Sequence, residues 1–124
     1  MSPSLILKGA VFLGATGIAL GAYGAHGLGK LPGITPKQIE SWDTASKYQQ
    51  FSAVTMLSLC ALSGNNILNI KHLKSSSVLI FAGTIMFSGS IYCLVLNKER
   101  FRSLGPITPI GGLSMIVGWL ALLF

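Results

Sequence analysis

The side chains best suited to chemistry in this sequence are two histidines, three tyrosines and two cysteines. A membrane enzyme could combine His26 with Tyr23 or Tyr92, but it would also need a base and an activated nucleophile, and the sequence offers neither. Cys60 and Cys93 belong to no CxxC pair and have no neighbouring histidine, so we interpret them as small buried residues. We therefore predict no catalytic residue, no cofactor and no bound metal.

A weaker alternative concerns His26 alone. A single histidine can relay a proton or bind a ligand near neutral pH. No carboxylate lies near His26 in the sequence, so we expect it to bond loop carbonyls or lipid headgroups at a membrane surface. His72 lies in a basic loop between Lys71 and Lys74, and we expect it to be solvated.

Polar residues also occur inside an apolar stretch, notably Ser52 and Thr55. Residues three apart share a helix face, and hydroxyl groups in lipid seek partners, so this face should point at other helices. The alternative is a polar path across a membrane, in a small oligomeric transporter or channel. The apolar stretches carry no Asp, Glu, Lys or Arg that could couple ion or proton movement, which favours the first interpretation.

The distribution of charge indicates the elements that hold these residues. The 124 residues are 51% hydrophobic and 10% charged, with a mean hydropathy of +0.66, which is unusual for a soluble domain. The charges flank four charge-free windows of 21 to 23 residues, and about 20 apolar residues span a bilayer as a helix. We predict a single all-α domain over residues 1–124, an integral membrane bundle of four transmembrane helices at about 5–26, 48–64, 76–97 and 107–124.

Small residues indicate how these helices pack. In water a glycine costs a helix up to about 1 kcal/mol, whereas in lipid it lets two helix backbones approach closely. Glycines at steps of three and four form one groove along the first helix, at Gly14, Gly17, Gly21 and Gly24. We expect other helices to pack into this groove, and we expect the same packing role for Ser88, Gly89, Gly111 and Gly112.

The second span should begin outside the hydrocarbon core. Thr35, Pro36 and Gln38 form a capping box with proline at the first helical position, which predicts a helix start at Pro36. A helix from there to Ser63 would be about 42 Å long, which exceeds the hydrocarbon thickness, so we predict an interfacial extension over residues 36–47. The side chains expected at the interface or against lipid are His26, Trp42, Tyr48 and Trp119.

Basic residues indicate the partners and the orientation. The net charge of +6 is dispersed over several loops and forms no single patch, so we expect membrane lipids and no nucleic acid as partners. Six basic residues follow the first and third spans, at Lys30, Lys37, Lys47, Lys98, Arg100 and Arg102. The opposite side has three, at Lys8, Lys71 and Lys74. This balance favours the six on the cytoplasmic or matrix side, with both termini on the other.

Three motifs occur in order: GAYGAHG at 21–27, FSGSIY at 87–92, and GPITPIGG at 105–112, which leads to Gly118 and Trp119. Together they resemble the transmembrane protein 256 family, over nearly the whole chain. The resemblance implies a small four-helix membrane protein without established chemistry, found in bacterial plasma membranes or associated with mitochondria. Members often carry a histidine shortly after the position of Tyr48. Here Phe51 is followed by Ser52, so paired histidines that bind metal or haem are not expected.

These features together predict a non-catalytic integral membrane protein. We expect a structural or accessory subunit packed into a larger membrane complex, such as a mitochondrial respiratory complex. Besides lipids, its expected partners are other membrane protein subunits or further copies of the chain. The mitochondrial inner membrane is the favoured location, or the bacterial plasma membrane if the source is prokaryotic. The small oligomeric transporter or channel stays open as the alternative.

Overall fold

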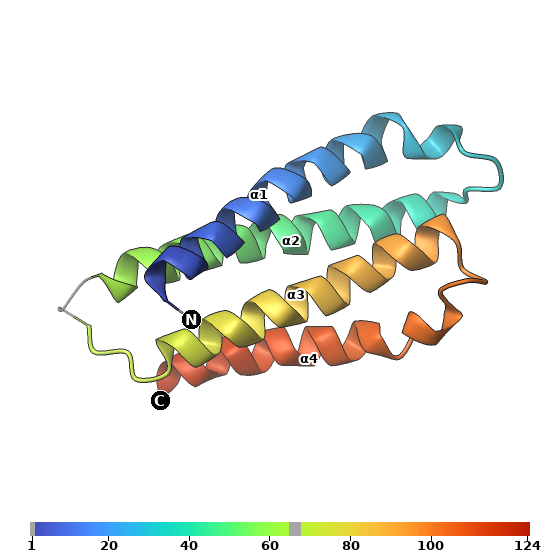
Figure 1. The fold of residues 1–124 in the computed structure, drawn as a ribbon. Coiled ribbons are helices and arrows are strands. Elements are labelled where there is room, and N and C mark those ends of the chain that lie inside the picture. The colour runs from blue at the N-terminus through green and yellow to red at the C-terminus, as the bar shows by residue number, and fades with distance from the viewer. Residues whose placement is uncertain (1, 65–67) are drawn as a thin grey trace.

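The structure is a computed structural model that describes residues 2–64 and 68–124. Within these residues the chain forms four α-helices and no strand (Figure 1), which confirms the all-α prediction. The helices are α1 (Pro3–His26), α2 (Pro36–Ser63), α3 (Leu73–Leu96) and α4 (Ile107–Leu120). Short 3₁₀ turns occupy Leu28–Lys30, Arg102–Leu104 and Ala121–Leu123.

Local side chains set where the first two helices begin. The Ser2 hydroxyl accepts a hydrogen bond from the backbone N–H of Leu5 at 3.3 Å, at the start of α1. In α2, Thr35 Oγ1 accepts from the Gln38 N–H at 3.2 Å, and Gln38 Oε1 accepts from the Thr35 N–H at 2.9 Å. These two bonds are the predicted capping box, and α2 begins at Pro36 as expected.

The helices pack in chain order, α1 on α2, α2 on α3 and α3 on α4. They run alternately up and down one axis, so the two chain ends lie at the same end of the molecule (Figure 1). Toward its C-terminal end α1 diverges from α3. Because α1 does not close against α4, long faces of both outer helices stay uncovered.

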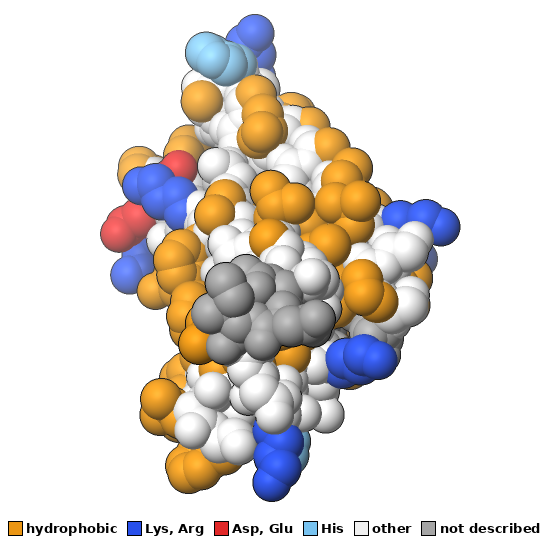
Figure 2. Space-filling view, turned by 90° about the vertical axis from the view of Figure 1, so that its left-hand side faces the viewer, with side chains coloured by type: hydrophobic (Ala, Val, Ile, Leu, Met, Phe, Trp, Pro, Cys, Tyr) orange, Lys and Arg blue, Asp and Glu red, His pale blue; other side chains and the backbone are white. Residues whose placement is uncertain are grey.

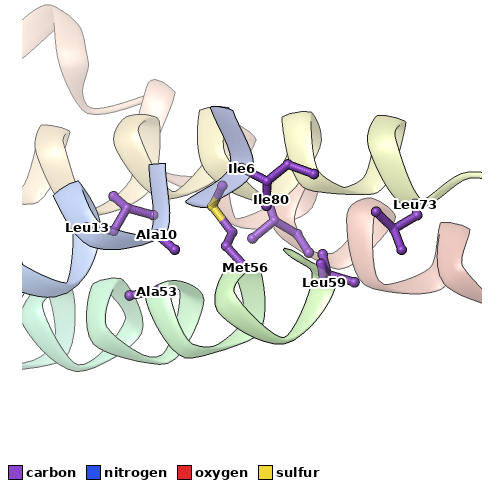
Figure 3. Packing of buried hydrophobic residues seen from close by; sticks show 8 residues of the cluster. All are labelled: Ile6, Ala10, Leu13, Ala53, Met56, Leu59, Leu73 and Ile80. Carbon is purple, nitrogen blue, oxygen red and sulfur yellow. The ribbon is translucent and has the colours of Figure 1, made fainter. Parts of the chain in front are cut away.

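Two clusters of buried apolar side chains hold the helices together. In the first, Met56 of α2 points toward Ile6 of α1 and Ile80 of α3 (Figure 3). Its members are Ile6, Ala10, Leu13, Ala53, Met56, Leu59, Leu73 and Ile80. The second cluster lies toward the opposite end of the helices and consists of Leu28, Trp42, Ala45, Tyr92 and Val95. Each cluster joins side chains from several helices, so the helices form one packed unit.

Three helical segments are long and apolar enough to cross a membrane: Pro3–His26, Leu73–Leu96 and Arg102–Leu123. α2 is not among them, because polar side chains interrupt its apolar half. Ser52 and Thr55 are among these polar residues, and both are buried against neighbouring helices, as expected. The crossing of α2 stays a prediction. Hydrophobic side chains cover much of the end view of the molecule, with basic side chains at its margins (Figure 2).

The predicted interfacial extension, residues 36–47, is continuous with the rest of α2. Trp42 and Ala45 in this segment are buried, Trp42 against α1 and Ala45 against Ser88 of α3. The extension therefore lengthens the bundle instead of bending along a membrane surface, because α1 and α3 continue beside it.

Candidate functional site

The glycine groove of α1 faces α2 along its length. The residues concerned are Gly14, Gly17, Gly21 and Gly24. A methyl group at Gly17 would lie 3.1 Å from Gln50 Cγ, and one at Gly24 would lie only 2.5 Å from Trp42 Cδ1. At Gly14 the same methyl group would make an ordinary contact, 3.6 Å from Ala53 Cβ. The tightest contact at a groove glycine is therefore at Gly24, where the large Trp42 ring fills the space between the two helices.

Because the glycine groove has no side chains, it exposes backbone carbonyls of α1 to side chains of α2. Three nitrogen donors use them: Trp42 Nε1 donates to Leu20 O (2.7 Å), Gln49 Nε2 to Leu13 O (3.1 Å) and Gln50 Nε2 to Gly17 O (3.0 Å). In an apolar medium such bonds satisfy groups that would otherwise be costly to bury. The glycine groove and the polar side chains of α2 therefore act as one interface.

Gln49 joins three helices. Its side chain is only 5% exposed, and its Oε1 accepts a hydrogen bond from the Tyr92 hydroxyl of α3 at 2.8 Å. Its Nε2 also lies 2.6 Å from Thr16 Oγ1 of α1. This role of Gln49 was not predicted from the sequence. The available signal was a pair of glutamines, Gln49 and Gln50, at the start of a charge-free window.

α3 and α4 approach each other even more closely. A methyl group at Gly111 would lie 2.5 Å from Phe87 N and 2.7 Å from Gly83 O, both backbone atoms. Gly118, seven residues later, would place one 3.1 Å from Ser76 O. Hydrogen bonds cross the same interface, from Ser76 Oγ to Gly118 O (2.5 Å), from Ser114 Oγ to Leu79 O (2.9 Å), and between the Ser90 and Thr108 hydroxyls.

The other predicted packing residues differ in their surroundings. Ser88 is buried and donates to Ala45 O of α2 at 2.7 Å. Gly112 lies in ordinary contact range of the Phe87 ring, at 3.6 Å. Gly89 departs from the expectation, because a methyl group there would meet no heavy atom within 4 Å. It faces an open cleft that is lined by residues of α1 and α3.

The residues expected at the membrane interface or against lipid also differ in their exposure. His26 is exposed, and Tyr48 and Trp119 are 49% and 44% exposed. Trp42 corrects the expectation, since it is only 2% exposed and its indole N–H is bonded to α1. Gly24 on the facing helix provides the space that buries the ring.

The two cysteines are half-buried and free, not buried as expected. Cys60 Sγ lies 3.4 Å from Pro3 O of α1, so the start of α1 covers only part of its side chain.

A cleft of about 230 Å³ opens between α1 and α3, with α2 as its floor. Phe12 of α1 and Ile85 and Gly89 of α3 line its sides. Gln49 and Tyr92 lie at the floor, where their polar atoms bond each other and α1. The surface that a ligand would meet is therefore apolar.

Charged groups lie outside this cleft. Across residues 2–64 and 68–124 one ion pair is present, between Lys47 Nζ and Asp43 Oδ2 at 2.8 Å. The hydrogen bond to Asp43 raises the pKa of Lys47 above its ordinary value. Both side chains are exposed, so the pair contributes little to stability. In the same part of the chain no three metal-ligating side chains come together.

Residues 20–112 match the family described as "Protein of unknown function (DUF423)". The chain belongs to the DUF423 family. The part of this DUF423 protein that matches includes Gly21 and Gly24 of the glycine groove, the Gln49 hub and the start of α4. No solved structure matches it significantly.

Relatives of this DUF423 protein occur in bacteria and yeast. UPF0382 membrane protein SAB0533 of Staphylococcus aureus is 41% identical over 107 residues, which cover 86% of this chain and 81% of the relative. UPF0382 membrane protein C1782.12c of Schizosaccharomyces pombe is 40% identical over 119 residues, 92% of this chain and 94% of the relative. UPF0382 inner membrane protein YgdD of Escherichia coli is 36% identical over 124 residues, which cover 99% of this chain and 89% of the relative. This DUF423 protein is an integral membrane protein.

Proposed function

We propose that this DUF423 protein is a non-catalytic structural or accessory subunit that packs into a larger membrane complex. Its buried polar side chains support this role, because they bond one helix backbone to the next. Trp42, Gln49 and Gln50 bond α2 to α1, and Ser88 bonds α3 to α2. Such a scaffold holds its outer surfaces in a fixed arrangement for a partner.

The observation that carries the proposal is the cleft between α1 and α3. Phe12 and Ile85 border it and are exposed, and Gly89 faces it with no heavy atom within 4 Å of the position where a Cβ would lie. A transmembrane helix of a partner can seat an apolar side chain between Phe12 and Ile85. The same helix can then approach α3 closely at Gly89, since small residues allow such contacts in lipid.

The resemblance to the transmembrane protein 256 family extends the proposal to a location. For a eukaryotic source we propose the mitochondrial inner membrane, with a respiratory complex as the larger assembly. For a prokaryotic source we propose the plasma membrane. The support is the resemblance in the motifs at 21–27, 87–92 and 105–112, together with relatives that are named as membrane proteins.

Extraction in a mild detergent followed by native mass spectrometry tests this proposal. We expect other membrane subunits to remain bound in a fixed stoichiometry. A homo-oligomer that conducts ions or carries solutes in liposomes would instead support a transporter or channel. A lone monomer without transport activity would also contradict the proposal.

A pair of variants tests the cleft itself. A Cβ at Gly89 would meet no heavy atom of the described chain within 4 Å, and the residue lines the cleft. Gly89→Leu should therefore place its bulk in the cleft, so that the bundle keeps its thermal stability and loses the bound subunits. Ala15→Leu adds comparable bulk to an exposed position of α1 and should keep them. Equal retention of the subunits by both variants would exclude the cleft as the docking surface.

A further inference from the structure

Another hollow lies where α2 begins, α3 ends and α4 begins, and its volume is about 290 Å³. Its polar lining includes Ser41, Lys98 and Thr108. Ile91 and Leu94 line its apolar part. A cation and two hydroxyl groups thus lie next to an apolar wall, which is a suitable lining for an amphiphilic molecule.

Lys98 gives this hollow a positive charge that no described carboxylate neutralises. The ion pair found within residues 2–64 and 68–124 joins other residues, Lys47 and Asp43. The two acidic residues of α2, Glu40 and Asp43, line a different hollow, which also contains Gly21 and Gly24 of α1. The side of α2 that faces the Lys98 hollow is therefore free of negative charge.

The surrounding elements add to the positive potential. Arg100 and Arg102 follow Lys98 in the connection between α3 and α4 and outnumber the single acidic residue there, Glu99. Thr108 lies in the first turn of α4, where the helix dipole also favours an anion, and Ser41 lies in the second turn of α2. Basic side chains at the ends of transmembrane helices attract anionic lipid surfaces.

An aromatic face continues from the hollow along α2. Tyr48 follows Ser41 by two helical turns, and Phe51 follows Tyr48 by three residues on the same side. Tyr48 packs edge-on against Phe87 of α3, with ring centroids 5.3 Å apart. Phe51 stacks on Trp119 of α4 at 5.8 Å. The rings line an apolar surface between α2 and α4 that suits an acyl chain.

We propose that this surface binds an anionic phospholipid. Lys98 neutralises the headgroup phosphate, the hydroxyls of Ser41 and Thr108 line the headgroup hollow, and an acyl chain lies over Tyr48 and Phe51. A free phosphate ion would gain nothing from the apolar wall and the aromatic face, whereas a lipid uses both. This site is separate from the α1–α3 cleft and does not depend on the proposed function.

Lipid binding by the intact protein in detergent tests the site. Native mass spectrometry with dioleoyl phosphatidylglycerol and dioleoyl phosphatidylcholine at equal concentration should show preferential retention of the anionic lipid. Lys98→Gln should lower the affinity for phosphatidylglycerol about fivefold, since one lysine near an anionic lipid surface contributes about that factor. Lys98→Arg, which keeps the charge, should preserve it.

A matched variant separates a local site from general charge attraction. Lys71→Gln removes the same charge at the opposite end of the helices and should leave phosphatidylglycerol binding unchanged. Equal losses in Lys98→Gln and Lys71→Gln would overturn the proposal, as would equal retention of both lipids by the wild type. Inorganic phosphate in excess should not displace the lipid. Displacement of the lipid by phosphate would show that the hollow binds a free anion and would also overturn the proposal.

Discussion

At the residue scale, we expect alanine substitutions at two glycines of this helical protein to have opposite effects on the free energy of unfolding. A methyl group at Gly111 would lie within 2.7 Å of backbone atoms of Phe87 and Gly83, which can move only if α3 and α4 separate. We expect Gly111→Ala to lower the free energy of unfolding by about 1–3 kcal/mol, the usual range for overpacking. Titration with sodium dodecyl sulfate in mixed micelles measures this change.

Gly89→Ala is the control for Gly111→Ala. It adds the same methyl group to α3 with no heavy atom of the described chain within 4 Å. We expect its unfolding free energy to be unchanged or higher by up to about 1 kcal/mol, because alanine is the better helix former. Equal losses in the two variants would contradict the close contact of α3 with α4.

The bond between Tyr92 and Gln49 makes a second prediction. Hydrogen bonds between transmembrane helices average about 0.6 kcal/mol, so Tyr92→Phe should lower the unfolding free energy by about that amount. In a Gln49→Leu background the same substitution should have no further effect, because its partner is already absent. A double-mutant cycle in detergent measures the coupling. The same loss in both backgrounds would show that the hydroxyl acts elsewhere.

Trp42 and Gln49 show what the sequence does not reveal about single residues. An indole near the end of an apolar span ordinarily suits the headgroup level, and Trp42 was expected there. Its burial depends on the space at Gly24 of another helix, which no local pattern in α2 encodes. The role of Gln49 likewise depends on Leu13, Thr16 and Tyr92, which lie 33 to 43 residues away in the chain.

At the scale of elements, the contact of α1 with α2 depends on the glycine groove. A methyl group at Gly17 or Gly21 would already lie 3.1 Å from the Gln50 side chain, and leucine is much larger. We expect Gly17→Leu and Gly21→Leu each to lower the unfolding free energy by at least about 1–3 kcal/mol. His26→Ala, at an exposed position of the same helix, should have little effect. Thermal unfolding in detergent compares the three, and equal tolerance would argue against the groove.

Element boundaries could be predicted where local side chains determine them. Thr35 and Gln38 lie three residues apart and cap α2 without help from another helix, so the predicted start at Pro36 was correct. α3 instead begins at Leu73, three residues before the predicted span at 76–97. A charge-free window marks only the apolar part of a helix. The backbone hydrogen bonds of α3 extend beyond the window toward the N-terminus and include Lys74, whose side chain is exposed.

At the scale of the molecule, composition was sufficient to predict an all-α membrane protein, since charge-free windows of this length suit membrane-spanning helices. The order of helix contacts could not be predicted. It follows from the fit of particular surfaces, such as Gly83 and Gly111 between α3 and α4, and Gly24 with Trp42 between α1 and α2. These fits leave α1 and α4 apart and create the clefts that carry both proposals.

The orientation in the membrane is the last prediction. Six basic residues lie in the connections after α1 and α3 and in the first half of α2, against three toward the opposite end. Positive charge favours the cytoplasmic or matrix side, so the end with Ser103 should face it and Ser2 should face outward. Single-cysteine variants, Ser2→Cys and Ser103→Cys, test this once Cys60 and Cys93 are replaced by alanine, because these changes preserve all nine basic residues.

A membrane-impermeant maleimide applied to intact cells or mitoplasts should label Ser2→Cys at once and Ser103→Cys only after permeabilisation. The two positions lie at opposite ends of the helices, so labelling of both from outside would contradict a membrane-spanning bundle. Labelling of Ser103→Cys alone would show that the bundle crosses in the opposite orientation. The Lys98 hollow would then face the outer leaflet, and its anionic lipid would have to come from that side.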